Sequence, residues 1–327
     1  MSDQDRSALF ALLDAQKVPG DYAAAARRFF APGAQINIVH PFNDMVGPEA
    51  YIEQFLNTLL DSFEGLFRRD YIATQGEFEG DSWTTATGYY AGHHVKPWLG
   101  IPASNALTYL RVGEFHKMKD GQAVESFIFL DIPELMIARG VWPVTSSPGV
   151  DRGYTSHLPG PATCDGLRRT ASDPARSAQS AQIVTDMLAG LATEDEAWRP
   201  YWHDNMMWYG PAAFGAFVGI ENFAGFQVPF EQTFQSWSGG SSGNGITRHE
   251  TRTADGDYVW TCGWPSLLAT GMRKPYLDVA PTGQDIKMRV CDWWRLEGEI
   301  IMENWVFVDI PDALRQLGVD VFEGLET

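Results

Sequence analysis

The chain repeats itself once, and this repeat limits its fold more than any other feature of the sequence. The segment FIFLDIP, Phe127–Pro133, returns 178 residues later as WVFVDIP, Trp305–Pro311. At the same spacing, RVGEFHKM at Arg111 matches RVCDWWRL at Arg289. The spacing falls to 176 between EGDSW and DGDYVW, as a loop insertion between matching blocks produces. A repeat of this length indicates a duplicated domain and not a solenoid.

The segment between the two copies is rich in proline, glycine and serine and poor in large apolar residues. Such a composition is typical of a linker between domains. We therefore predict a first domain over residues 1–145, a linker over 146–178 and a second domain over 179–327. A length of 327 residues with 44% apolar and 13% aromatic residues is enough for two packed cores.

Each copy begins with helical signals and continues with strand signals. In the first copy, Gly47-Pro48 opens a stretch on which Tyr51, Phe55 and Leu59 share one face. The segments that follow are rich in β-branched and aromatic residues, and Asp120-Gly121 is typical of a tight hairpin turn. This order predicts α+β domains, in which N-terminal helices pack on a strongly curved antiparallel sheet and enclose a pocket.

Charge and composition exclude several classes of partner. The net charge of −18 repels polyphosphate and anionic lipid, so we expect neither nucleic acid nor membrane as a partner. The start, MSDQDRSALF, lacks the order of a secretory signal, and no apolar run approaches membrane-spanning length. Cys164, Cys262 and Cys291 form no C-x-x-C pair, which is typical of thiols in a reducing compartment. We expect a cytoplasmic protein.

Three segments of the first copy carry a family resemblance. The run GHHVKPWLGIPAS, Gly92–Ser104, the KDGQAVES hairpin and FLDIPELMIARG resemble the SnoaL-like polyketide cyclases. These belong to the nuclear transport factor 2-like superfamily of cone-shaped α+β barrels. The resemblance covers Tyr22–Trp142 and Trp198–Phe322, so the chain resembles two tandem SnoaL-like domains.

The resemblance also implies an activity and an assembly. The activity is the aldol cyclisation of a hydrophobic carbonyl compound, a polyketide ester, in which a buried carboxylic acid moves the proton. The reaction uses no metal and no other cofactor. Single domains of this kind often pair through the outer sheet face, so the two copies are expected to form such a pair within one chain. Further oligomerisation stays open.

The family's acid/base aspartate lies on the last strand, three residues before the aspartate that corresponds to Asp131 and Asp309. Counted onto this chain, that position is Ile128 in the first copy and Val306 in the second. Neither half therefore carries the family's carboxylate there. Asp131 and Asp309 each precede Ile-Pro, a context that predicts a cap for the following short helix.

Other polar residues match the family's pocket better. His94 falls on a pocket histidine of the family, and a second pocket histidine falls on Glu114 in the first copy and Asp292 in the second. Since strand residues two apart share a face, Glu114 lies beside His116, and Asp292 beside Trp294. A carboxylate among apolar groups is expected to have a raised pKa. We predict His94, Glu114, His116 and Asp292 as catalytic residues.

The pocket is expected to be more polar in the first copy and more aromatic in the second, which holds nine of the twelve tryptophans. The residues predicted to line the two pockets are Trp98, Ser126, Trp264, Met272, Trp294 and Asn304. Such a lining suits a flat hydrophobic ligand.

Simpler interpretations stand beside these. Glu114 and Asp292 could be solvated, or could pair with Arg111 and Arg289. His94 could be an exposed histidine at a strand end, or could join Glu114 and His116 around a metal, although their spacing matches no known ligand motif. We predict no metal site.

Two functions from different classes are compatible with the sequence. The first is an enzyme that performs cofactor-independent acid–base chemistry, an aldol cyclisation or isomerisation, on a hydrophobic carbonyl compound. The second is a non-catalytic small-molecule-binding protein of the same fold. The carboxylates at the equivalent positions Glu114 and Asp292 favour the enzyme, whereas Ile128 and Val306 favour the binding protein.

Overall fold

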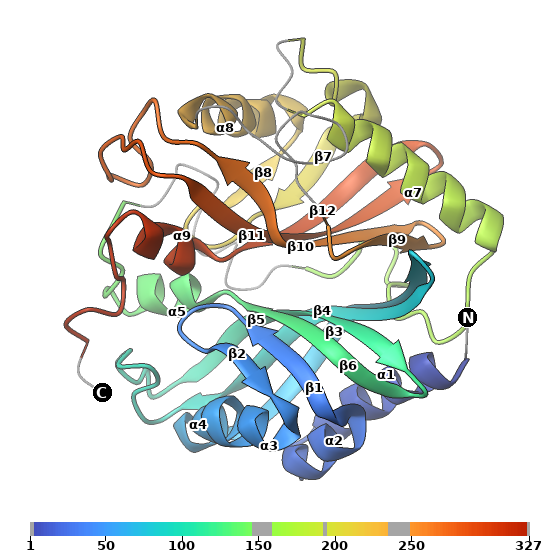
Figure 1. Ribbon diagram of the computed structural model, residues 1–327, viewed down its shortest axis with the longest axis vertical. Coiled ribbons are helices and arrows are strands. Elements are labelled where there is room, and N and C mark those ends of the chain that lie inside the picture. The colour runs from blue at the N-terminus through green and yellow to red at the C-terminus, as the bar shows by residue number, and fades with distance from the viewer. Residues whose placement is uncertain (1–2, 146–158, 192–194, 235–248, 326–327) are drawn as a thin grey trace. The chain divides into compact units, whose positions relative to one another are not determined.

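The computed structural model describes residues 3–145, 159–191, 195–234 and 249–325 (Figure 1). The chain divides into two compact units. Unit 1 comprises residues 1–141, 159–171 and 322–327, and unit 2 comprises residues 142–158 and 172–321. The linker predicted over 146–178 lies partly outside the described residues. Its residues 159–171 belong to unit 1.

Unit 1 is an α+β domain with a six-stranded sheet. Its helical elements are α1 (Asp3–Gln16), α2 (Tyr22–Phe29), α3 (Gly47–Tyr51), the π-helical turn η1 (Ile52–Leu56), α4 (Asn57–Ser62) and α5 (Ile132–Ala138). Its strands are β1 (Phe30–Ile38), β2 (Asn43–Val46), β3 (Phe63–Phe78), β4 (Asp81–His94), β5 (Leu107–Lys119) and β6 (Gln122–Leu130). The strand order is β2-β1-β6-β5-β4-β3, antiparallel except for β1 beside β6.

Unit 2 repeats this plan. Its helical elements are α7 (Pro174–Ala189), η2 (Arg199–Tyr201), α8 (Ile220–Thr233) and α9 (Ile310–Gln316). Its strands are β7 (Trp202–Tyr209), β8 (Ala216–Val218), β9 (Thr251–Asp255), β10 (Tyr258–Ala269), β11 (Ile286–Glu297) and β12 (Ile300–Val308). The order β8-β7-β12-β11-β10-β9 matches that of unit 1 strand for strand, with one parallel pair, β7 beside β12.

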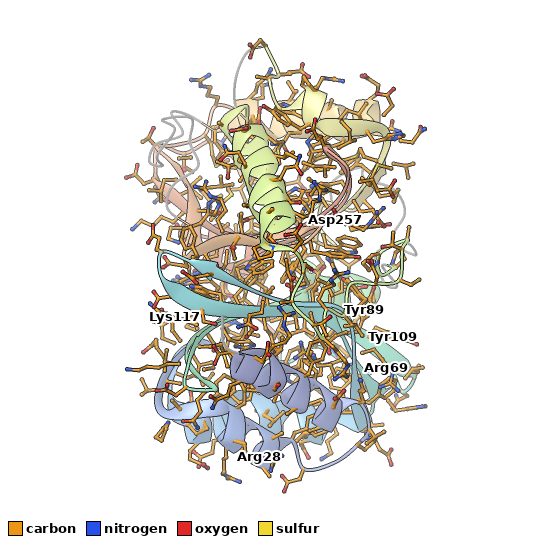
Figure 2. All side chains as sticks on the ribbon, turned by 90° about the vertical axis from the view of Figure 1, so that its right-hand side faces the viewer. Arg28, Arg69, Tyr89, Tyr109, Lys117 and Asp257 are labelled. Carbon is orange, nitrogen blue, oxygen red and sulfur yellow. The ribbon has the colours of Figure 1, made fainter. Side chains whose placement is uncertain are left out.

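The predicted fold class is confirmed in both units. In unit 1, α2, α3 and α4 cover one face of the sheet, and in unit 2, α7 and α8 do so (Figure 1). Arg28 in unit 1 and Asp257 in unit 2 are among the exposed charged residues (Figure 2). The sequence did not predict the parallel pair, because periodicity within a strand carries no information about its neighbour's direction.

The predicted hairpin at Asp120-Gly121 is present. Both residues have positive φ, 53° and 77°, and they connect β5 directly to β6. This is the backbone of a type I′ turn, which the sequence Asp-Gly favours. The register that follows pairs Glu114 with Ile128 in unit 1, and the second hairpin pairs Asp292 with Val306 in unit 2. Each hairpin has a register shift close to its turn, at Lys117/Met118 and at Arg295/Leu296, so the two candidate carboxylates lie at equivalent positions.

The two aspartates before Ile-Pro differ in their capping role. Asp309 caps α9, because its Oδ1 accepts a hydrogen bond from the Asp312 amide at 3.2 Å. The expected cap at Asp131 is wrong, since its side chain makes no capping hydrogen bond to α5. Both aspartates form ion pairs with the arginines of the repeat, Asp131 with Arg111 at 3.2 Å and Asp309 with Arg289 at 3.0 Å.

Part of the segment that follows the first copy covers an edge of the sheet in unit 1. The Ala73 amide in β3 donates to the Gly166 carbonyl at 2.9 Å, and the Arg168 amide donates to the Ala73 carbonyl at 2.8 Å. Since β3 is an edge strand, these bonds satisfy backbone groups that would otherwise be open to pairing with another chain. Within the described part of the chain, no helix is long and apolar enough to span a membrane.

Candidate functional site

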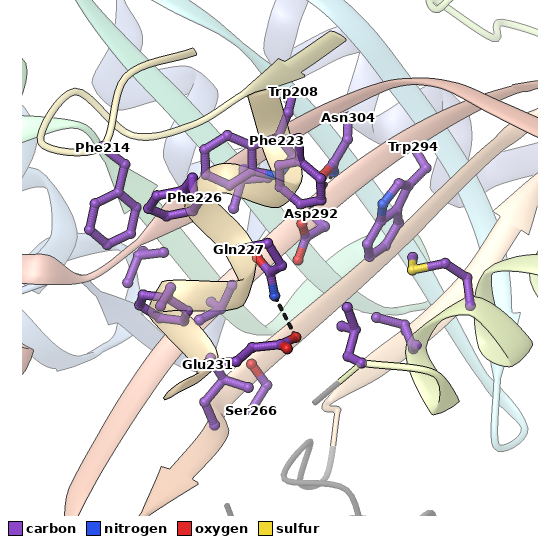
Figure 3. Close-up of a pocket in the computed structure, with 18 of the residues that line it drawn as sticks. Trp208, Phe214, Phe223, Phe226, Gln227, Glu231, Ser266, Asp292, Trp294 and Asn304 are labelled. Carbon is purple, nitrogen blue, oxygen red and sulfur yellow. Dashed lines mark hydrogen bonds between the residues drawn. The ribbon is translucent and has the colours of Figure 1, made fainter. Parts of the chain in front are cut away.

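Unit 2 encloses a cavity of about 130 Å³ between α8 and the inner face of its sheet, which we call the Asp292 cavity (Figure 3). Its walls are mainly aromatic and aliphatic. The aromatic side chains that line it are Trp202, Trp208, Phe214, Phe223, Phe226, Phe230 and Trp294. A cavity of ~150 Å³ is known to hold benzene, so this space suits a ligand group of about one ring.

Two neighbouring strands supply the floor of the Asp292 cavity. Met288, Val290, Asp292 and Trp294 alternate along β11 and all face it. Asn304, Val306 and Val308 do the same along β12. This is the period of two that a strand imposes on its side chains. Of the residues grouped with Asp292 from the sequence, Trp294 and Asn304 lie on this floor and Trp264 does not.

Asp292 lies on this floor beside Asn304 (Figure 3). The side-chain amide of Asn304 donates a hydrogen bond from Nδ2 to Asp292 Oδ1 at 3.2 Å. Burial among apolar side chains raises the pKa of Asp292 to about 7, although hydrogen bonds from Asn304 and Thr261 favour the ionised form. Asp292 is only partly buried, and it is one of the residues that line the cavity. A carboxyl with this pKa can both accept and return a proton near neutral pH.

Val306, which stands where the resemblance implies the family's acid/base aspartate, lies directly across from Asp292 in the register of β11 and β12. Side chains opposite each other in an antiparallel pair have Cβ atoms about 5 Å apart. The missing carboxylate and Asp292 therefore occupy neighbouring places on the same surface. In this chain a carboxyl enters the cavity from β11 instead of β12.

Two indole N–H groups belong to residues of the same cavity. Trp294 and Trp202 are 2% and 6% exposed, and among the described residues no acceptor binds Nε1 of either. Figure 3 shows the indole nitrogen of Trp294 on the side of the ring toward Asp292. A buried donor without a partner costs free energy, and a ligand oxygen would recover that cost.

The sequence-based reasoning missed the polar residues that α8 and the segment before β9 bring to the cavity. On α8, Gln227 Nε2 donates to Glu231 Oε1 at 2.9 Å, and both side chains line the cavity (Figure 3). His249 lines it as well, and burial lowers the pKa of this imidazole to about 3, with Arg252 acting in the same direction. The i, i+4 spacing of Gln227 and Glu231 was a usable signal.

The equivalent carboxylate of unit 1 lies in an opposite environment. Glu114 forms an ion pair with Arg68 at 2.7 Å and contacts His116 at 3.4 Å, all three side chains being almost fully buried. Burial opposes its ionisation, but Arg68 and His116 outweigh burial and hold the pKa of Glu114 at about 2. The expected rise in the pKa of Glu114 is therefore wrong, because β3 supplies a cation that the local sequence of β5 does not reveal.

The structure brings together only part of the predicted cluster in unit 1. His116 lies beside Glu114, and its Nδ1 is 2.9 Å from Ser126 Oγ. His94 lies elsewhere, because it pairs with Phe63 at the end of β4, eight residues beyond the partner of Glu114 in that strand. At about 3.3 Å per residue, eight residues span roughly 26 Å along the strand.

His94 packs in the core of unit 1 instead of at an exposed strand end. Its ring stacks on that of Phe63 with centroids 4.5 Å apart, and burial, aided by Arg139, lowers the pKa of the imidazole. Among the described residues, no group of three or more His, Cys, Asp or Glu side chains could hold a metal ion.

Three predicted pocket residues lie away from the two carboxylates. Trp98 packs in unit 1 against Phe63 and donates from Nε1 to Thr58 Oγ1 at 3.2 Å. The ring of Trp264 lies under the guanidinium of Arg289 at 4.3 Å. The amide of the buried Met272 donates to the Thr282 carbonyl. Neither Trp264 nor Met272 is among the described residues that line the Asp292 cavity.

By its strand order and its helix-covered cavity, unit 2 is a curved-sheet α+β domain. Its residues 184–304 match the family model of the SnoaL-like domain. Unit 2 therefore carries a SnoaL-like domain, and unit 1 repeats its strand order. The match agrees with the resemblance stated from the sequence.

The chain also matches solved structures over less than half of its length. A proposed SnoaL-like polyketide cyclase from Jannaschia sp. CCS1 is 24% identical, with 41% of this chain and 90% of that chain covered and a TM-score of 0.36. IdmH, a proposed polyketide cyclase from Streptomyces antibioticus, is 17% identical, with 42% of this chain and 97% of that chain covered and a TM-score of 0.35. AclR, a proposed hydroxylase from Streptomyces galilaeus, is 16% identical, with 43% of this chain and 97% of that chain covered and a TM-score of 0.35. A comparison with curated proteins found no match.

Proposed function

We propose that unit 2 is a cofactor-independent acid–base catalyst of the polyketide cyclase type, acting next to a carbonyl group of a hydrophobic small molecule. The observation that carries this proposal is Asp292, a carboxyl with a pKa of about 7 on the floor of an aromatic cavity. A pKa near the working pH is the property that general acid–base catalysis requires. The match of residues 184–304 to the SnoaL-like domain supports it.

The proposed reaction begins and ends at Asp292. Its carboxylate takes the proton from the carbon next to the carbonyl and leaves an enolate, whose oxygen accepts a hydrogen bond from the Trp294 indole N–H. The enolate carbon then attacks a second carbonyl group of the same molecule, and the alkoxide that forms takes the proton back from Asp292. The product is an isomer of the substrate, so the reaction needs no oxidant and no reductant.

The charges around the cavity favour a neutral substrate. Among the described residues that line it, none is Lys or Arg, and two are carboxylic acids, Asp292 and Glu231. The imidazole of His249 is neutral near pH 7, because burial lowers its pKa. Together with the net charge of −18, these groups repel phosphorylated and carboxylated ligands.

We propose a structural role for the corresponding position of unit 1. Glu114 already binds Arg68 and His116, and its low pKa keeps it ionised at neutral pH. A carboxylate held by a buried guanidinium is a weak base. One catalytic site in each chain is therefore expected, in unit 2.

The test of the function is exchange of the α-protons of hydrophobic β-keto esters and cyclic ketones in deuterated water. We expect the wild-type protein to accelerate exchange with saturation by the ketone. Binding without acceleration of exchange would instead support the second candidate, a non-catalytic binding protein, which the valine at position 306 favours.

The rate of exchange should depend on pH in one direction. Asp292 must be ionised to accept a proton, so kcat should rise tenfold per pH unit below about 7 and level off above it. His249 titrates with a pKa of about 3 and should leave this range unaffected. A profile that is flat from pH 5 to pH 9 would exclude Asp292 as the base.

Trp294→Phe should slow exchange by about 10²-fold, the effect of removing one donor to an oxyanion. The matched control is Trp208→Phe, which changes another indole of the same cavity. We expect the indole ¹H–¹⁵N resonance of Trp294 to shift downfield when a phenolate, which mimics the enolate, binds. Equal rate losses in the two variants would show that the indoles contribute aromatic surface to the cavity and that the Trp294 N–H does not stabilise the enolate oxygen.

A further inference from the structure

A second hollow lies on the other side of the aromatic side chains of α8. It is a cleft of about 350 Å³, which we call the Tyr276 cleft. Phe214, Phe226 and Phe230 line both the Tyr276 cleft and the Asp292 cavity. The three rings contact one another, with centroids 5.2 to 5.8 Å apart. They therefore form a thin wall, one side chain thick, between the two spaces.

The far side of the Tyr276 cleft is formed by a fixed turn. Tyr276 and Val279 exchange backbone hydrogen bonds of 3.0 and 2.9 Å, with Leu277 and Asp278 at positive φ between them. The Asp278 carboxylate accepts hydrogen bonds from the amide and the hydroxyl of Thr145. These bonds hold Tyr276 against the wall, where its ring lies 6.3 Å from those of Phe214 and Phe230.

Two polar groups of the cleft are suited to a ligand. The hydroxyl of Tyr276, a residue that is 5% exposed, has no hydrogen-bond partner among the described residues. Burial raises the pKa of this phenol, so the group stays neutral and can donate as well as accept. The second polar group is the backbone carbonyl of Gly225 in α8. Pro229, four residues later, has no N–H to donate to this carbonyl, and both residues line the cleft.

The sizes of the two spaces suggest how they are used. The Asp292 cavity has room for about one ring, whereas the cleft offers more than twice its volume. Phe226 and Phe230 are only partly buried, which leaves room on the cleft side for their rings to turn. Rotation of Phe230 would join the two spaces.

We propose that the Tyr276 cleft is a second subsite of the same binding site, which takes the distal, hydroxyl-bearing ring of a ligand whose carbonyl end lies beside Asp292. Phe214, Phe226 and Phe230 are the wall between the subsites and set the length of ligand that fits. This inference rests on the proposed function of the Asp292 cavity, since it assumes that the carbonyl end binds there.

The test compares three ketones by isothermal titration and tryptophan fluorescence: acetophenone, 2-acetylnaphthalene and 6-hydroxy-2-acetylnaphthalene. In the wild-type protein the hydroxyl should strengthen binding of the naphthyl ketone about fivefold to tenfold, the effect of one hydrogen bond. Tyr276→Phe should abolish that difference and leave acetophenone unchanged. The control is Tyr201→Phe in η2. Tyr201 is not among the described residues that line the Asp292 cavity or the Tyr276 cleft.

Phe230→Ala supplies an independent measurement. Removing the ring should join the two spaces, so it should strengthen binding of both naphthyl ketones relative to acetophenone by at least fivefold. Circular dichroism checks that each variant is folded, and Tyr276→Phe preserves nearly the whole side-chain volume. The subsite is refuted if the hydroxyl has no effect in the wild-type protein, or if Tyr276→Phe weakens all three ketones equally.

These outcomes are separate from those of the proposed catalysis. Binding is measured without turnover, and it can be repeated with Asp292→Asn. A hydroxyl effect that depends on Tyr276, without any acceleration of exchange, would establish the subsite and reject the catalyst. Exchange that depends on Asp292, without an effect of the ligand's hydroxyl on binding, would establish the catalyst and reject the subsite.

Discussion

Asp292→Asn should reduce the rate of α-proton exchange by roughly 10²-fold to 10⁴-fold, the usual contribution of a positioned general base. The asparagine keeps the size of the side chain and can still bond to Asn304, but it cannot accept the proton. Because ketone binding depends mainly on the aromatic walls, the dissociation constant should change little. The measurement is kcat by NMR in deuterated water, with binding followed separately by titration.

The control for this variant is Glu231→Gln, the other carboxylic acid that lines the cavity. It should retain kcat within about threefold, since Glu231 lies on α8 and accepts a hydrogen bond from Gln227. If Glu231→Gln loses the activity and Asp292→Asn keeps it, the base has been assigned to the wrong carboxylate. The proposed mechanism would then have to start from α8.

Glu114→Gln should instead act on stability, with a loss of about 3–5 kcal/mol in the free energy of unfolding. The substitution leaves the guanidinium of Arg68 buried with one anionic partner fewer, Asp70 at 2.8 Å being the one that stays. Exchange activity should remain at temperatures where the protein is folded, because Asp292 belongs to the other unit. Chemical denaturation gives the first quantity and exchange below the unfolding transition the second.

The dependence of this loss on pH has a definite sign. The folded-state pKa of Glu114, about 2, lies below its ordinary value of 4.5, so the stabilisation is present above pH 4.5 and is lost as the pH falls toward 2. Wild type and Glu114→Gln should therefore converge in stability at low pH. Asp292→Asn should show no comparable loss, since a buried carboxyl with a raised pKa opposes folding when it ionises. Equal destabilisation by the two substitutions would contradict the contrast between the sites.

The repeat predicted the fold well because each copy carries complete local signals. Asp120-Gly121 defines a hairpin whose strands place Glu114 opposite Ile128, and the hairpin between β11 and β12 places Asp292 opposite Val306 in the same way. The period of two along β11 then groups Asp292 with Trp294 without knowledge of any other strand. This part of the site could be read from the sequence.

The rest of the site depends on strands and helices that are distant in the sequence. Arg68 reaches Glu114 from β3, and no pattern within β5 reveals that cation. Similarly, the match of His94 to a family histidine gave its place along β4 but not the stacking on Phe63. Unit 2 shows the same limit, since Glu231 and Phe230 reach the cavity only through the packing of α8 on the sheet.

The bonds of Ala73 to Gly166 and Arg168 have a consequence for how the protein is made. Synthesis proceeds at ~5–20 residues per second. Several seconds therefore pass between the synthesis of Leu130, the last residue of the sheet in unit 1, and the synthesis of the segment that binds β3. Over that interval the nascent chain presents an open strand edge to neighbouring ribosomes and chaperones. A recombinant fragment that stops at residue 141 would leave the Ala73 amide and carbonyl open to another chain, whereas one that ends at residue 171 would keep their partners.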